Sequence, residues 1–189
     1  MSTKKGEETK EKIMRATVDF IVRDGIENVG INKIIKEASV SKGSFYHYFS
    51  SMDELIKEVA IYTFERCLQH MPLSQTSSVE DIVKNLGKHI FTSVRNHNRD
   101  YYLLFLFISK SFVDEELRQS FRTIFSNIVY NNTVAQQIMH ENPEIDAEQL
   151  QTLDMLALGF IVHCHLLQDE EQLLPVWNRM TSHLFNKEG

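Results

Sequence analysis

Apolar residues recur at helical spacing along almost the whole chain, and this periodicity restricts the possible folds more than any other feature. Ile13 and Phe20 follow such a pattern near the start, and Leu173, Trp177 and Leu184 follow it near the end. Seven Gly and three Pro among 189 residues leave few positions for the tight turns of a β-sheet. The sequence therefore predicts an all-α fold of about nine helices.

The stretch 40–49, Val-Ser-Lys-Gly-Ser-Phe-Tyr-His-Tyr-Phe, combines several aromatic rings with several hydrogen-bond donors. On a helix, Phe45 and Phe49 lie four residues apart and share one face, so they predict a buried side. Ser41 is suited to be the N-cap, because its hydroxyl can accept an otherwise unpaired backbone N–H. Helical patterns over 9–25 and 31–38 precede this segment, which predicts a helix-turn-helix of three helices.

The remaining side chains of this segment are suited to DNA. Lys42 could donate to guanine O6 or N7 or to phosphate, and Gly43 permits a close approach of the backbone. Ser44, Tyr46 and His47 could donate to phosphate oxygens or base edges. An ordinary amphipathic helix, with packed rings and a solvated lysine, explains the same spacing. Both interpretations remain open from spacing alone.

Residues 9–66 resemble the DNA-binding domain of TetR-family transcriptional regulators, above all in the stretch 40–49. The resemblance implies that Ser41, Lys42, Gly43, Ser44, Tyr46 and His47 form the DNA-contacting helix, with Asn32 and Lys33 near the groove edge. It further implies a homodimer on double-stranded operator DNA. The larger C-terminal helical domain of such a regulator binds a small-molecule effector, and the effector usually releases the operator.

Three residues depart from the family pattern. Ser39 stands where Gly is common in the turn, so either Ser adopts a strained conformation at a cost of about 1 kcal/mol or the turn differs. Gly30 replaces the usual Ser or Thr N-cap of the second helix, and Met52 lies where Lys is frequent. Because Gly30 lacks a hydroxyl and Met52 lacks an ammonium group that could contact phosphate, we expect a shallow salt dependence of DNA binding.

The expected organisation is a flexible arm over residues 1–8, a helix-turn-helix domain over 9–55 and a ligand-binding and dimerisation domain over 56–189. Residues 1–60 carry ten Lys/Arg and ten Asp/Glu, so the net charge of −6 resides in residues 61–189. This asymmetry favours the N-terminal end for contact with a polyanion. A helix opened by a Ser51-x-x-Glu54 capping box is expected to contain the domain boundary.

Aromatic residues concentrate in the C-terminal part, where they predict either plain packing or a cavity for a mainly apolar effector. The resemblance favours the cavity, and the residues expected to line it are His89, Tyr101, Tyr102, Phe105, Phe121, Phe125, Phe160 and His163. Helices over 147–167 and 173–186 are the expected dimer surface, because residues 155–164 are apolar on nearly every side. A non-sensing DNA-binding protein whose C-terminal half only dimerises is the alternative.

The sequence gives little support to other classes of protein. Cys67 and Cys164 lie far apart without CxxC spacing, so neither a disulfide framework nor a zinc site is expected. No P-loop, Ser/His/Asp signature or carboxylate pair indicates an enzyme, and no cofactor is expected. The apolar run 155–164 is too short to span a bilayer, which predicts a cytoplasmic protein without a membrane partner.

Overall fold

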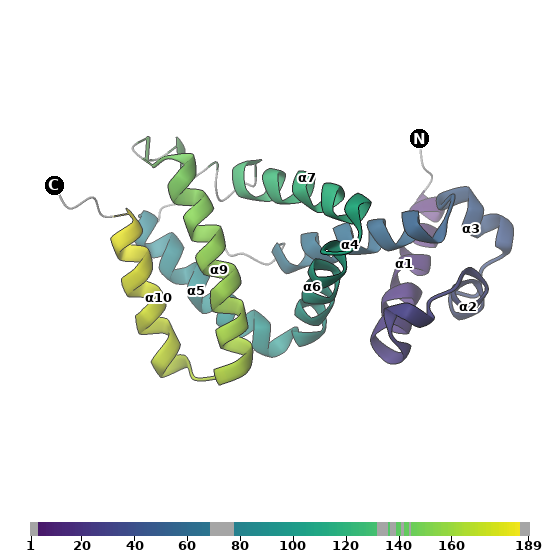
Figure 1. The fold of residues 1–189 in the computed structure, drawn as a ribbon, viewed down its shortest axis with the longest axis horizontal. Helices are drawn as coiled ribbons and strands as arrows, with labels where there is room; N and C mark the ends of the chain where they lie inside the picture. Colours follow the sequence, from purple (N-terminus) through teal and green to yellow (C-terminus); the bar gives the residue numbers. More distant parts are fainter. Residues whose placement is uncertain are drawn as a thin grey trace.

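The computed structural model consists of helices joined by short connections (Figure 1). It describes residues 4–68, 78–131, 136, 139–140, 142–143 and 145–185. Across these ranges the chain forms nine α-helices, one 3-10 helix and no strand, which confirms the predicted fold class. The helices are α1 (Lys4–Asp24), η1 (Ile26–Asn28), α2 (Ile31–Glu37), α3 (Lys42–Tyr48), α4 (Met52–Leu68), α5 (Val79–Asn96), α6 (Asn98–Ser111), α7 (Glu115–Asn131), α9 (Ala147–Leu167) and α10 (Glu170–Phe185).

The first helix begins earlier than expected. Residues 4–8, which the sequence assigned to an arm before the first helix, belong to α1, and residues 1–3 lie outside the described residues. Glu7 in the first turn interacts favourably with the helix dipole, and an Arg15–Glu11 ion pair of 2.5 Å adds an i,i+4 contact. The helix ends as predicted before Gly25, whose φ of 85° lies in the left-handed region.

Helices α1 to α3 pack as a small unit at one end of the molecule (Figure 1). Its centre consists of fully buried apolar side chains from all three helices, namely Ile13, Ile21, Ile34, Phe45 and Phe49. Burying side chains of this size contributes about 1.5–3 kcal/mol each, so the position of α3 is fixed by its apolar side.

Helix α4 is shared between the two ends of the chain. Leu55 and Val59 are fully buried and α4 packs against α1, whereas Phe64 stacks on Phe121 of α7 with ring centroids 4.8 Å apart. The predicted cap is present in part, because the Ser51 hydroxyl accepts the Glu54 N–H at 3.1 Å. The Glu54 carboxylate, however, accepts from the N–H of Ser50 at 2.6 Å rather than from Ser51.

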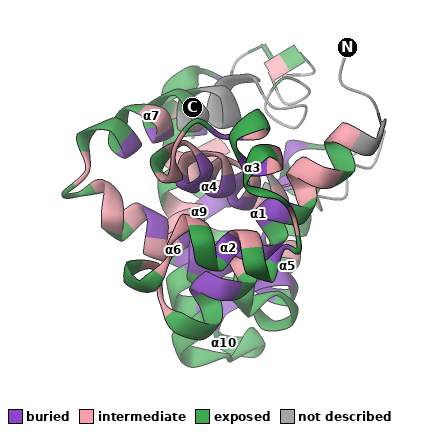
Figure 2. Cartoon of the chain, turned by 90° about the vertical axis from the view of Figure 1, so that its right-hand side faces the viewer, coloured by how far each residue is buried: buried purple, intermediate pink, exposed green. Residues whose placement is uncertain are grey.

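The C-terminal helices α5, α9 and α10 lie beside one another (Figure 1). Trp177 of α10 is 2% exposed, and its Nε1 donates to the backbone oxygen of Val83 at 2.8 Å. Figure 2 shows the buried residues on the inward sides of the helices. The predicted extension of α7 to about residue 140 falls largely outside the described residues, and α7 itself ends at Asn131.

Helix α9 is strongly apolar but poorly covered. Over the described ranges it is the one helix long and apolar enough to cross a membrane, a property that core helices of soluble proteins share. Only 22% of its most apolar 18-residue window is buried. Met155 is 62% exposed and Leu166 is 69% exposed. A single chain therefore leaves much of this helix's apolar surface uncovered.

Candidate nucleic-acid interface

The turn between α2 and α3 is built on a left-handed residue. Ser39 has a φ of 49°, its N–H donates to Lys36 O at 3.1 Å, and the Val40 N–H donates to Ile35 O at 3.1 Å. These two bonds form the Schellman arrangement that usually carries Gly at the position of Ser39. Ser39 thus adopts the strained conformation expected if the usual turn is kept.

Ser41 then begins α3 as predicted. Its hydroxyl accepts the backbone N–H of Ser44 at 3.0 Å, and the two hydroxyl oxygens lie 2.9 Å apart. Both predicted DNA-contacting hydroxyls are therefore engaged with each other at the N-terminus of the helix. This cap fixes where α3 starts and which side chains occupy its first turn.

One side of α3 is an apolar anchor. Phe45 and Phe49 are fully buried and their ring centroids lie 5.8 Å apart. The Lys10 ammonium lies 5.8 Å from the Phe49 ring centroid and forms a 2.8 Å ion pair with Glu58. The two predicted anchors are confirmed, and Lys10 of α1 is committed to contacts within the chain.

The other side of α3 presents polar groups to solvent. Lys42, Gly43, Tyr46 and His47 are exposed, and the Lys42 ammonium lies 5.9 Å from the Tyr46 ring centroid. A Cβ added to Gly43 would have Ser41 Oγ, at 3.8 Å, as its nearest contact. No packing within the described chain requires Gly at this position.

The two predicted residues of α2 differ in their placement. Asn32 is exposed. The Lys33 ammonium donates to Asn28 O at 2.9 Å and lies 5.5 Å from the Phe20 ring centroid. Lys33 is therefore directed toward η1 and α1 rather than toward α3. Gly30, at the start of α2, provides no side-chain cap, as its sequence predicts.

The eight residues predicted to line an effector cavity do not share one environment. Tyr101, Phe121 and Phe160 are buried, Tyr102 and His163 are exposed, and His89 and Phe105 are half-buried. The side chain of Phe125 lies outside the described residues. Phe160 packs on Trp177 with ring centroids 4.7 Å apart. The buried rings serve at least as core packing.

Polar groups nevertheless occur inside the C-terminal part. Ser93 Oγ lies 3.2 Å from His89 Nε2. Burial raises the pKa of the Tyr101 hydroxyl, and it raises the pKa of the Cys67 and Cys164 thiols to about 12. Both thiols are free and therefore protonated near neutral pH. The described residues include no group of His, Cys, Asp and Glu that could hold a metal ion.

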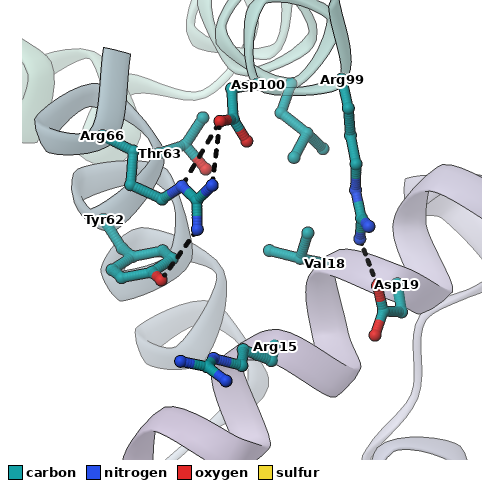
Figure 3. Close-up of a pocket in the computed structure, with 9 residues that line it drawn as sticks. Arg15, Val18, Asp19, Tyr62, Thr63, Arg66, Arg99 and Asp100 are labelled. Carbon is teal, nitrogen blue, oxygen red and sulfur yellow. Dashed lines mark hydrogen bonds and ion pairs between the residues drawn. The ribbon is translucent and has the colours of Figure 1, made fainter. Parts of the chain in front are cut away.

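A cavity that the sequence did not predict lies between α1, α4 and α6 (Figure 3). It measures about 290 Å³ and is lined by Arg15, Val18, Asp19, Tyr62, Thr63, Arg66, Arg99, Asp100 and Leu103. The sequence could not predict this cavity, because its charged lining residues come from three helices that are far apart in the sequence.

Comparison with known proteins agrees with this geometry. Residues 13–59 match the family described as bacterial regulatory proteins, tetR family. An uncharacterised HTH-type transcriptional regulator from the lacX 3′ region of Lactococcus lactis subsp. lactis is 30% identical over 125 residues, which cover 64% of each chain. The match thus spans a little under two-thirds of that relative's length.

Two solved structures have the same fold. A TetR transcription regulator from Haloarcula marismortui superimposes with a TM-score of 0.71 at 18% identity, covering 94% of this chain and 96% of that one. The multidrug binding protein EbrR, complexed with imidazole, gives a TM-score of 0.70 at 16% identity, covering 95% and 96%.

The fold and the three-helix unit define the class, a helical protein with an N-terminal helix-turn-helix. Within that class, residues 13–59 are the DNA-binding domain of the TetR family of bacterial regulatory proteins.

Proposed function

We propose that the protein is a homodimeric, sequence-specific DNA-binding repressor whose α3 enters the major groove of an operator. The observation that carries this proposal is the division of α3 into a fully buried side, Phe45 and Phe49, and an exposed side that bears Lys42, Tyr46 and His47. A recognition helix needs both sides, because the buried one fixes its orientation and the exposed one contacts bases and phosphates.

The electrostatics support weak attraction to the phosphate backbone. Lys10 pairs with Glu58, Arg23 pairs with Glu37, and Lys33 donates to Asn28 O. The Arg23 guanidinium also lowers the pKa of Glu37, so this pair stays charged at neutral pH. Of the cations near α3, Lys42 is exposed and lies over an exposed aromatic ring.

We therefore expect few phosphate contacts and a shallow salt dependence of DNA affinity. Each phosphate contact adds about one to the slope of log K against log salt concentration. Anisotropy titrations at several salt concentrations measure this slope directly. A slope near ten, typical of a binder with many phosphate contacts, would contradict the expectation.

Dimerisation through α9 and α10 is supported by their uncovered apolar side chains. On α9, Met155, Val162, Leu166 and Leu167 are at least 39% exposed, and on α10, Val176 and Met180 are 47% and 48% exposed. Two copies can cover these side chains by pairing as a four-helix bundle. The two α3 helices would then meet half-sites roughly 34–36 Å apart.

Effector binding is proposed for the interior of the C-terminal part, near His89, Ser93 and Tyr101. These groups could orient a small, mainly apolar molecule among buried rings. The fold shared with EbrR, a multidrug binding protein complexed with imidazole, supports a sensing role. The effector would favour a dimer whose half-site spacing no longer fits the operator, and would thereby release it.

The DNA assignment can be tested with the double variant Lys42→Ala/Tyr46→Ala on a duplex selected from a random-sequence library. We expect affinity to fall at least about thirtyfold, because losing two contacts of about 1 kcal/mol each has that effect. The matched control is Lys88→Ala/Tyr102→Ala, which removes an exposed lysine and a tyrosine 49% exposed, compared with 47% for Tyr46.

Light scattering must show that both variants have the same oligomeric state as the unchanged protein. If the α3 variant is dimeric and binds the duplex as tightly as the control, the assignment of α3 fails. Displacement of the unchanged protein from the duplex by a set of small aromatic compounds tests the sensing role separately. Operator binding that no such compound weakens would favour the non-sensing alternative.

A further inference from the structure

The cavity between α1, α4 and α6 is lined mainly by charged side chains. Three guanidinium groups line it, from Arg15, Arg66 and Arg99, against the two carboxylates of Asp19 and Asp100. Figure 3 shows that Arg66 and Arg99 reach the cavity from opposite sides. The site lies where the helix-turn-helix unit meets the C-terminal helices, and its lining includes neither His89 nor Ser93.

The arginines keep unused binding capacity. Arg66 donates to one oxygen of Asp100 at 3.2 and 3.4 Å and to the Tyr62 hydroxyl at 3.3 Å. A well-formed guanidinium–oxyanion bond is shorter, about 2.7–2.9 Å, and is frequently bidentate. Arg99 uses one nitrogen to pair with Asp19, although a guanidinium has five N–H donors.

Two further features suit a small organic anion. Val18 and the buried Leu103 supply apolar surface against which a short hydrocarbon body can lie. Arg99 and Asp100 belong to the first turn of α6. The positive end of this helix dipole therefore adds to the attraction for an anion in the cavity.

We propose that this cavity binds a small carboxylate- or phosphate-bearing organic molecule between Arg66 and Arg99. The anion competes with Asp19 for Arg99, so the direct ion pair between α6 and α1 is lost and the ligand instead bridges Arg99 of α6 to Arg66 of α4. The site is separate from the effector site proposed for the C-terminal interior. An occupant would give the regulator a second input, a consequence that rests on the proposed function.

Isothermal titration of the full chain at constant chloride concentration tests binding without any reference to DNA. The probes are benzoate and phenyl phosphate, with benzamide as the neutral counterpart of benzoate and benzylammonium as the cation. We expect one anion per chain and at least tenfold weaker binding of benzamide and benzylammonium. Inorganic phosphate distinguishes the source: binding as tight as that of phenyl phosphate identifies a site for free phosphate, and weaker binding identifies an organic anion.

Two matched pairs of variants locate the site. Arg99→Gln should weaken benzoate binding at least tenfold, whereas Arg122→Gln on the exposed surface of α7 should not. Val18→Phe fills the cavity without changing any charge and should have the same effect. Val22→Phe, one turn further along α1 at a position 41% exposed, is its control.

Two outcomes would overturn the proposal. One is benzamide binding as tightly as benzoate, because the arginines would then contribute nothing. The other is unchanged benzoate binding by Arg99→Gln and Val18→Phe, because the anion would then lie elsewhere. Circular dichroism verifies that each variant is folded, and Arg99, whose side chain is 44% exposed, tolerates replacement without leaving a buried charge.

Discussion

The contact between Gly87 of α5 and Trp177 of α10 yields the most demanding prediction. A Cβ added to Gly87 would lie 2.3 Å from Trp177 Cδ1, 2.4 Å from Nε1 and 2.8 Å from Cγ. The indole cannot move aside easily, because it is 2% exposed, packs on Phe160 and donates to Val83 O. Gly87→Ala should therefore force α5 and α10 apart or displace the ring.

Opposing effects determine how much Gly87→Ala changes the free energy of unfolding. Overpacking a well-packed core costs about 1–3 kcal/mol. Losing the Trp177–Val83 hydrogen bond leaves a buried indole N–H and costs about 1–3 kcal/mol. Replacing Gly by Ala inside a helix returns about 1 kcal/mol. We expect Gly87→Ala to lower the free energy of unfolding by about 3 kcal/mol, although helix propensity alone would raise it.

Urea denaturation, followed by circular dichroism at fixed protein concentration, measures this change. A double-mutant cycle with Trp177→Leu isolates the contact: once the indole is absent, Gly87→Ala should cost much less. A stabilising Gly87→Ala, or an equal cost in both backgrounds, would refute the close approach of the two helices.

Three further changes test the α2–α4 region. Ser39→Gly should raise the free energy of unfolding by about 1 kcal/mol, since Gly adopts the left-handed conformation without strain, and should leave DNA affinity unchanged. Gly43→Ala should leave stability unchanged or slightly higher, yet weaken DNA binding in anisotropy titrations if the backbone approaches DNA there. Hydrogen bonds from Ser50 lower the pKa of Glu54, so this carboxylate stabilises the fold above its unfolded pKa of about 4.3 and ceases to do so as pH falls. The difference in melting temperature between the unchanged protein and Glu54→Gln should therefore shrink between pH 7 and pH 3; a constant difference would argue against this ionisation.

Local sequence chemistry determined much of the candidate DNA interface. The sequence predicted Ser41 as the N-cap of α3, because a run of polar and aromatic residues follows it. The four-residue spacing of Phe45 and Phe49 predicted the buried side. The sequence left two possibilities for the turn at Ser39, a strained serine in the usual turn or a different turn. The positive φ of Ser39 agrees with the first. Each of these features depends on residues within a few positions of one another, which is the range that periodicity and capping rules describe.

Contacts between distant helices could not be derived in this way. Arg99 and Asp19 are separated by 80 residues, and Trp177 and Val83 by 94. Helical spacing tells which residues share a face but not which helix that face meets. For the same reason, the sequence could not show that Phe160 is buried and Tyr102 exposed, and both were predicted to line one cavity.

Exposed ion pairs supplement the apolar packing of α4 where the two ends of the molecule meet. Ion pairs connect α1 and α4 to α6 and α7, and each has at least one partner whose side chain is more than 40% exposed: Arg99–Asp19, Arg66–Asp100 and Lys57–Glu116. Exposed pairs contribute about 0–1 kcal/mol each, whereas removing a buried phenylalanine costs about 3–5 kcal/mol. Because the core of α1 to α3 is apolar, tilting this unit about α4 costs less than deforming it. A ligand signal that reaches α4 or these ion pairs would therefore move α3 as part of a rigid unit.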